Sequence, residues 1–274
     1  MKQQNFFGQI AKRQSFFGIL TVICAKNRNF VGRMQEKLNG IVINVIKYNE
    51  KHNIAHIYTD KLGMLAFLVR QGTTHAARMR NAMFMPLSLL EFEARLQPNR
   101  DLGTPHDVRR TATLMSIYSD PMKNAIAMFL SELLSHTIQE QEQNMVLYSF
   151  IKSCIVRLEE MSGSVANFHI CFLYRLGQFI GIQPDIDSYH EGYWFNMNEG
   201  VFTQSPHPGM KSLPPAQAQV LPLLSRMTFD NMHHFKFSRD QRNEMLEMIL
   251  GYYRLHHSTL GTLRSPDVLK QLFV

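Results

Sequence analysis

Cysteine is scarce in this chain, and the few cysteines lie far apart. Cys24, Cys154 and Cys171 are the only three. They are too few and too scattered for a disulfide framework or for a zinc site built mainly of cysteine. We therefore expect a reducing compartment.

The sequence also lacks the common catalytic motifs. It contains no GxxxxGK loop, no GxGxxG turn, no GxSxG elbow and no HExxH pair. Adjacent histidines diverge by about 100° on a helix, so pairs such as His233 with His234 do not form a ready metal site. We interpret His169, His256 and His257 as core or surface histidines, and the glutamates Glu159, Glu160, Glu244 and Glu247 as parts of solvated helix faces. The sequence therefore predicts a binding or mediator protein, and we expect no catalytic site, no cofactor and no metal.

Acidic residues are missing from the first part of the chain. Residues 1–33 hold six lysines and arginines and no aspartate or glutamate. Residues 34–115 hold eleven basic residues against seven acidic ones, and residues 116–274 hold twelve against fifteen. The basic character therefore lies at the front of the chain, which favours a polyanion such as nucleic acid as partner. A solvated surface with a modest excess of lysine is the alternative.

No apolar run near the N-terminus is long enough to span a bilayer. The apolar stretch of residues 16–25 follows Lys12 and Arg13, which is a pattern typical of a signal peptide. No small-x-small cleavage pattern follows it. We expect residues 1–33 to be an N-terminal extension that results from an upstream start codon, with Met34 as the true start. A basic arm and an export signal are the alternatives.

A group of short apolar runs follows this extension. Residues 40–46, 54–59 and 64–69 are rich in β-branched and aromatic residues, and turn formers separate them. This pattern predicts a three-stranded antiparallel meander, with a fourth strand at 87–94 and a fifth at about 107–113. Strands that are apolar on both faces are typical of a closed or strongly curled sheet. We predict a five-stranded OB-type barrel for residues 34–115, with an SH3-like barrel as its competitor.

Helical patterns fill the rest of the chain. Asp120 and Pro121 mark a helix start, and Ser238 with Gln241 forms a capping-box pattern. Apolar spacing predicts helices at residues 122–137, 145–160, 165–180, 215–227 and 239–257, and a short one from Ser265. We predict an α-helical domain at 116–274 with an irregular insertion at 182–213, so that the fold class is α+β.

A cation-rich segment joins the third and fourth predicted strands. Residues 70–81 contain three arginines and a histidine with no acid. Such a loop can wrap a phosphate backbone, and a solvated connector is the alternative interpretation. The candidate nucleic-acid-binding residues are Lys47, Lys51, His52, Lys61, Arg70, His75, Arg78, Arg80, Arg109 and Arg110. Tyr48, Tyr58 and Phe67 are candidates for base stacking, or else members of the barrel core.

The order and spacing of several segments resemble the RecO family of bacterial recombination mediators. The matching segments are residues 34–42, 48–52, 58–63, 70–80, 85–91, 127–134, 167–181, 252–257 and 263–265. The resemblance covers about residues 34–274. It implies an N-terminal OB fold, a C-terminal helical domain and a chain that begins at Met34. Some members carry a four-cysteine zinc site after the third helix, but residues 182–213 contain no cysteine, so we expect no zinc.

The resemblance also implies a function in DNA repair and recombination. Its elements are binding of single- and double-stranded DNA, annealing of complementary strands, and a complex with RecR. Contact with the C-terminal tail of the single-strand DNA-binding protein would help to load RecA on coated DNA. The expected location is the cytoplasm, at the nucleoid, and no membrane partner is expected. Arg157 and Arg175 are candidates for the contact with that tail, because an acidic peptide needs an apolar groove with a basic side chain. The alternative is that each extends from a helix face into solvent.

Two other functions remain open from the sequence. A non-catalytic RNA-binding OB protein is the first, because charge alone does not distinguish RNA from DNA. An enzyme with its site in the insertion is the second, with Tyr189, His190, Glu191 and Trp194 as the residues concerned. No paired nucleophile and base can be named there, which disfavours it.

Overall fold

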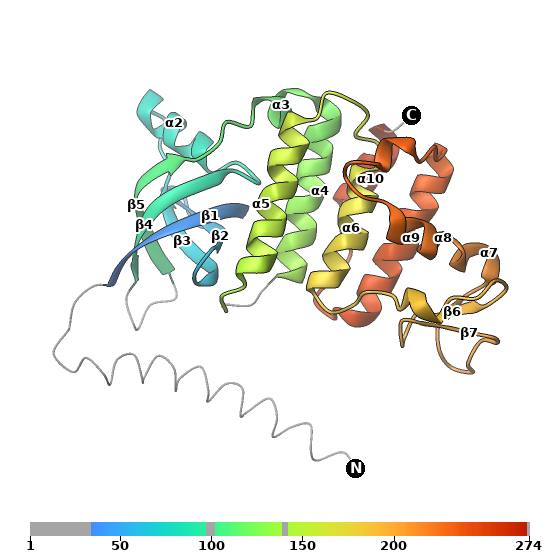
Figure 1. Ribbon diagram of the computed structural model, residues 1–274. Helices are drawn as coiled ribbons and strands as arrows, with labels where there is room; N and C mark the ends of the chain where they lie inside the picture. Colours follow the sequence, from blue (N-terminus) through green and yellow to red (C-terminus); the bar gives the residue numbers. More distant parts are fainter. Residues whose placement is uncertain (1–33, 97–101, 139–141, 273–274) are drawn as a thin grey trace, which may run out of the picture.

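The computed structural model of the protein describes residues 34–96, 102–138 and 142–272. A β-barrel stands at one side of the molecule, helices follow, and a small sheet lies on the side away from the barrel (Figure 1). The expected extension at residues 1–33 lies outside the described residues. In the described part of the chain, no helix is both long and apolar enough to cross a membrane.

Five strands close into the predicted barrel. They are β1 (Met34–Lys47), β2 (His52–Thr59), β3 (Gly63–Arg70), β4 (Leu89–Leu96) and β5 (Leu102–Arg110). Their order around the barrel is β1-β2-β3-β5-β4, and only the short β3–β5 contact is parallel. The OB-type barrel is thus confirmed. The fourth strand begins two residues later than predicted, and the fifth lies earlier, over Leu102–Arg110.

Alternating apolar residues fill the barrel. Phe67 and Phe92 meet edge to face inside it, with ring centres 5.1 Å apart, and both are buried. Gly40 of β1 pairs with residues of both β2 and β4, and a side chain there would overlap those of Ile57 and Phe92. The absence of a Cβ at Gly40 is therefore what allows β1 to pair with both β2 and β4.

The prediction of a basic loop at residues 70–81 is wrong over most of that segment. Helix α2 (His75–Met83) occupies it, and the Thr74 hydroxyl caps the helix by accepting from the Ala77 amide at 3.2 Å. Alanine, methionine and arginine dominate this segment, and these residues favour helices. A threonine directly in front of them supplies the start signal. Its arginines therefore project from a helix, with fixed directions relative to one another.

The helical part contains α3 (Met115–Ser119), α4 (Pro121–Thr137), α5 (Met145–Glu160), α6 (Phe168–Phe179), α7 (Pro215–Ala218), α8 (Val220–Arg226), α9 (Arg239–His256) and α10 (Ser265–Leu272). Asp120 caps α4, and Ser238 with Gln241 forms the predicted capping box of α9. The predicted helix at 215–227 is two helices instead. Pro222 has no amide to donate to the carbonyl of Ala218, so a continuous helix is interrupted there.

The insertion at 182–213 is more regular than predicted. It contains the 3-10 helix η1 (Ile186–Ser188) and a sheet of β6 (Trp194–Asn196), β7 (Val201–Thr203) and β8 (Ser212–Leu213) in the order β7-β6-β8. The buried Asn196 accepts from the amides of Asn198 and Glu199 at 3.0 and 3.3 Å. Strands of two or three residues are too short to produce a readable periodicity, which is why the sequence did not reveal them.

The barrel and the helices share one hydrophobic core. Ile41, Ile43 and Tyr58 face outward from the barrel and pack in the same buried cluster as α4 and α5. A β-bulge between Val42 and Asn44 interrupts the β1–β2 register. Ser131 of α4 donates a buried hydrogen bond to the Ile43 carbonyl at this bulge. The helical part therefore satisfies a polar group that the barrel leaves without a strand partner.

Glu159 is not on a solvated helix face as predicted. Its carboxylate accepts from the Ser116 and Ile117 amides, each at 2.8 Å, and so caps the first turn of α3. Glu247 also has partners, since its carboxylate lies 2.5 Å from Lys270 Nζ and 3.9 Å from Arg254 Nη1.

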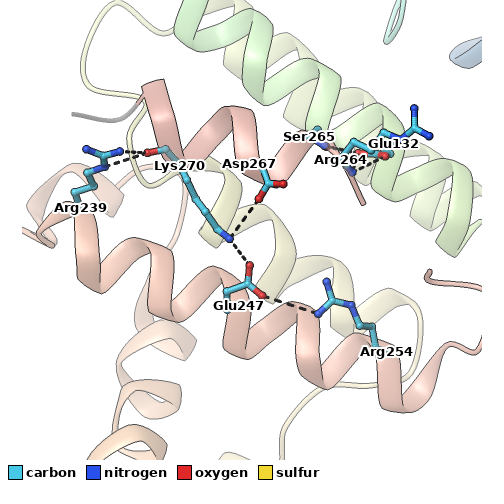
Figure 2. Close-up of polar contacts among 8 residues, drawn as sticks. All are labelled: Glu132, Arg239, Glu247, Arg254, Arg264, Ser265, Asp267 and Lys270. Carbon is cyan, nitrogen blue, oxygen red and sulfur yellow. Dashed lines mark hydrogen bonds and ion pairs between the residues drawn. The ribbon is translucent and has the colours of Figure 1, made fainter. Parts of the chain in front are cut away.

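The last helix, α10, is held at both ends (Figure 2). At its start, Glu132 of α4 accepts from the Arg264 and Ser265 amides and from the Ser265 hydroxyl. At its end, the Arg239 guanidinium of α9 donates to the Lys270 carbonyl at 2.7 and 3.0 Å. These contacts fix α10 against α9, the helix before it, and against α4, which is distant in the sequence.

Candidate nucleic-acid interface

The predicted cationic residues gather at one end of the barrel. His52 and Arg70 are Cα partners at the same end of the β2–β3 hairpin. Lys47 pairs with Asn53 on the neighbouring strand, and the Lys51 carbonyl accepts from the Gln71 amide at 2.7 Å. The β1–β2 turn and the end of β3 therefore lie side by side.

Helix α2 and strand β5 bring further cations to this end. α2 follows β3 directly, and β5 runs parallel to β3 and continues past it. The Arg110 guanidinium donates to the Ala82 carbonyl, which ties β5 to α2. Nine of the ten candidate residues thus share one region, here called the cationic end: Lys47, Lys51, His52, Arg70, His75, Arg78, Arg80, Arg109 and Arg110. All are exposed except His52, which is half-buried.

Lys61 is the one candidate that the fold places elsewhere. It lies in the turn at the opposite end of the β2–β3 hairpin, which at 3.3 Å per residue is about 23 Å from His52. Lys61 Nζ lies 2.6 Å from Glu36 Oε1 and donates to the Lys37 carbonyl at 2.9 Å. The hydrogen bond to Glu36 raises the pKa of Lys61 above its ordinary value. This lysine links a turn to β1.

The helical form of residues 75–83 separates Arg78 from Arg80. Two positions along an α-helix differ by about 200°, so the two side chains leave nearly opposite faces of α2. Arg78 Nε donates to the Thr73 carbonyl at 3.0 Å. Arg80 instead lines a groove between α2 and the barrel strands.

This groove, here called the end groove, lies between the end of β3, helix α2 and residues 104–108 of β5. Its volume is about 500 Å³. Its lining includes two arginines, Arg70 and Arg80, and two histidines, His52 and His106, against one carboxylate, Asp107. Met83, Phe84 and Val108 contribute apolar surface. A cationic rim over an apolar wall can hold an anionic group together with a flat apolar one.

His106 and the apolar wall were missed by sequence reasoning. His106 stands in a mixed segment, Thr104-Pro105-His106-Asp107, that gives no strand signal. Its place beside Arg80 depends on α2, which was predicted as a loop, and on the separation of β5 from β3 beyond Gly103. The sequence could have indicated His106 only if residues 75–83 had been predicted as a helix and the basic residues that pack around that helix had then been counted.

The three aromatic candidates have different surroundings. Tyr48 is 60% exposed in the β1–β2 turn, next to Lys47. Tyr58 is buried, and its hydroxyl donates to the Asn144 carbonyl at 3.4 Å. Phe67 is buried inside the barrel. Tyr58 and Phe67 are therefore too buried to stack on a nucleic-acid base, and both belong to the core, which was the alternative interpretation.

The candidates for contact with a partner tail lie in the helical part. Arg175 Nη2 donates to the Met227 and Ser225 carbonyls at 2.6 and 3.0 Å, at the end of α8. Arg157 pairs with the exposed Asp230 and lines a shallow hollow on α5 with Lys152 and Val156. Arg157 is thus the more accessible of the two.

The insertion residues considered for an enzyme site do not converge. The Tyr189 ring packs on Phe202 with centres 5.1 Å apart, and the His190 ring lies 4.9 Å from that of Tyr193. His190 and Glu191 are exposed. Within the part of the chain that the structure describes, no group of three or more histidine, cysteine, aspartate or glutamate side chains could hold a metal ion.

The fold and its cationic end define an OB-type barrel protein with a helical extension, and a family model matches each of these two parts of the chain. The family model described as Recombination protein O N terminal matches residues 34–113, and the one described as Recombination protein O C terminal matches residues 118–261. The chain belongs to the Recombination protein O family.

Curated relatives agree with this membership. The DNA repair protein RecO of Bacteroides fragilis is 40% identical over 242 residues, which is 88% of this chain and 100% of the relative. Those of Phocaeicola vulgatus and Flavobacterium psychrophilum are 36% and 32% identical, again over 88% of this chain and all of the relative. The resemblance inferred from segment order is confirmed.

Proposed function

We propose that this protein acts in DNA repair by binding single-stranded DNA at the cationic end and annealing complementary strands. With RecR and the single-strand DNA-binding protein it helps to load RecA, in the cytoplasm at the nucleoid and without catalysing a covalent step. The gathering of nine candidate cations at one end of the barrel supports the DNA-binding part. Membership of a family whose relatives are named DNA repair proteins supports the repair role.

The chemistry of the cationic end suits an annealing protein. Lysine and arginine contacts to phosphates do not depend on sequence, and salt screens them. A mediator has to act on any damaged strand and then release it. Contacts of this kind can hold two strands weakly until their bases pair, whereas base-specific contacts would restrict the substrate.

Salt-dependent binding of labelled single-stranded DNA, followed by anisotropy, tests the site. Replacing both Arg70 and Arg80 by alanine should weaken binding and reduce the slope of log K against log salt by about 0.7 for each phosphate that the variant no longer neutralises. Lys61→Ala is the matched control, because it removes a cation of the same barrel that lies away from the cationic end. Equal effects of the two changes would refute this location of the site.

Annealing and nucleic-acid preference need separate assays. The protein should accelerate pairing of complementary DNA strands coated with the single-strand DNA-binding protein, and no acceleration would contradict the mediator role. The alternative, an RNA-binding OB protein, rests on the same surface. Competition between DNA and RNA strands of matched sequence distinguishes them, since a clear preference for RNA would favour the alternative.

The hollow around Arg157 on α5 is our proposal for the partner tail. Support comes from its exposed cations, Lys152 and Arg157, and from the engagement of Arg175 with backbone carbonyls. An acidic tail peptide should bind the Arg157→Ala variant less tightly than the intact protein. Arg226→Ala, which changes an exposed arginine on α8, serves as control. Unchanged peptide affinity in the Arg157 variant would remove this site.

A further inference from the structure

We propose that the end groove holds one unstacked nucleotide of the bound single strand, with its phosphate on Arg70 and Arg80 and its base against the apolar wall. This proposal rests on the proposed DNA binding and adds to it a source of preference for single strands. It concerns the concave part of the cationic end, whereas Lys47, Lys51 and Arg109 lie outside the groove lining.

The size and chemistry of the groove match a nucleotide. Its volume of about 500 Å³ lies within the range of ordinary small-ligand sites. Arg70 and Arg80 reach it from β3 and α2, so guanidinium groups approach a bound phosphate from two elements, and the His52 ring of β2 adds an N–H donor. Guanidinium groups are well suited to phosphate oxygens because their donors form a planar fork. The single carboxylate, Asp107, leaves an excess of positive charge.

The apolar wall distinguishes this groove from a purely ionic surface. Met83 and Val108 are half-buried, and Phe84 is 8% exposed. A base has two apolar faces and can cover such a wall, which gains stacking and burial energy without reading sequence. A free phosphate ion would leave the wall uncovered. The arrangement therefore favours a nucleotide over an inorganic anion.

The groove should discriminate between single and double strands. A base in a duplex is paired and stacked, and moving it out costs a few kcal/mol. A single strand can present a base at much lower cost. Exposed cations outside the groove contact the phosphates of either form, so the groove adds affinity for the single strand alone.

The chain offers a matched pair of variants for the test. Arg78 and Arg80 belong to the same helix and carry the same charge, but only Arg80 lines the groove. Arg80→Ala should weaken single-strand binding about tenfold, since it removes a hydrogen bond that involves a charged group. Arg78→Ala removes an exposed cation of the cationic end outside the groove, so it should weaken binding less. Thr104→Trp fills the groove from an exposed position, so it can block entry without disturbing the barrel core.

The probe is an oligonucleotide that carries 2-aminopurine, whose fluorescence rises when the base leaves its stack. We expect a rise when the intact protein binds, and no such rise in Arg80→Ala and Thr104→Trp at saturating protein. Duplex affinity should stay unchanged in Thr104→Trp. If the intact protein binds the strand but fluorescence does not rise, or if Arg78→Ala and Arg80→Ala behave alike, the groove proposal fails and the proposed function stands. Failure of the intact protein to bind any single strand would overturn both.

Discussion

At the scale of single residues, the least expected feature is the burial of polar side chains inside the helical part. Lys123 is 4% exposed, and its ammonium group donates to Ser116 Oγ, the Glu159 carbonyl and the Met161 carbonyl at 2.6, 3.0 and 2.6 Å. An ammonium group has three protons, so this arrangement satisfies all of them. Lys123 thus joins α3, α4 and the end of α5, a role that its place in a helical pattern does not reveal.

His169 of α6 allows a prediction about acid stability. Burial, together with the nearby Arg242, lowers the pKa of His169 from 6.5 to about 3. Below pH 6.5 the unfolded chain therefore binds a proton that the folded chain does not, and the free energy of unfolding falls as pH falls. Between pH 7.5 and 5.5 this residue should remove about 1.4 kcal/mol.

Urea unfolding of the intact protein and of His169→Gln at pH 7.5 and 5.5 measures this contribution. The variant should lose less stability over this interval than the intact protein, by about 1.4 kcal/mol. His190→Gln changes an exposed histidine and should retain the full pH dependence. An identical pH dependence in the His169 variant would show that this side chain is not the buried titrating group.

At the scale of elements, short helices owe their positions to caps and to contacts with distant residues. α2 begins at the Thr74 cap, and α10 begins where Glu132 accepts from the Arg264 and Ser265 amides (Figure 2). Helices of eight or nine residues are marginal on their own. Their stability must therefore come from the caps and from the surfaces on which they pack.

The Glu132 cap predicts an effect on α10 that depends on pH. Burial opposes ionisation of Glu132, but the hydrogen bonds from Ser265 and Arg264 outweigh it and lower the pKa below 4.5. The cap therefore contributes fully above the unfolded pKa and disappears as pH falls through the folded one. Glu132→Ala should cost about 1 kcal/mol at pH 7, a typical value for removal of a cap.

Urea unfolding at pH 7 and at pH 3.5 provides the measurement. The difference between the intact protein and Glu132→Ala should shrink at the lower pH. Glu244→Ala, at an exposed position of α9, is the control and should change stability little. A Glu132 variant as stable as the intact protein at pH 7 would mean that α10 does not depend on this cap.

At the scale of the whole molecule, the barrel and the helices share one buried cluster. Ile41, Ile43, Tyr58, Leu87 and Leu89 of the barrel side belong to the same buried cluster as α4, α5 and α6. The division into residues 34–115 and 116–274, which remains our proposal, therefore separates two folds but cuts through one core.

This shared core predicts that the barrel does not fold well alone. A fragment of residues 34–115 exposes these five apolar side chains, which favours aggregation over a stable monomer. We expect the full chain to unfold in a single thermal transition, since unfolding of the helices removes the packing surface of the barrel. Calorimetry of the full chain and size-exclusion chromatography of the fragment test this. Two separate transitions, or a monomeric fragment with a cooperative transition, would contradict it.

The sequence alone determined the fold class, most strand and helix positions and the set of candidate basic residues. These features follow from local causes: residue periodicity, caps such as Asp120 and Ser238, and turn formers between apolar runs. Segment order also sufficed to indicate the family, because it combines many weak local signals.

Only the tertiary structure decided which cations lie together. Lys61 and Arg70 belong to the same hairpin, yet strand pairing places them at opposite ends, whereas Arg110 reaches α2 from a strand distant in the sequence. His106 joins Arg80 in the end groove for the same reason. A sequence does not show in which direction a charged side chain points. That direction, and the neighbours of the side chain, depend on the closure of the barrel, which brings together residues that are far apart in the sequence.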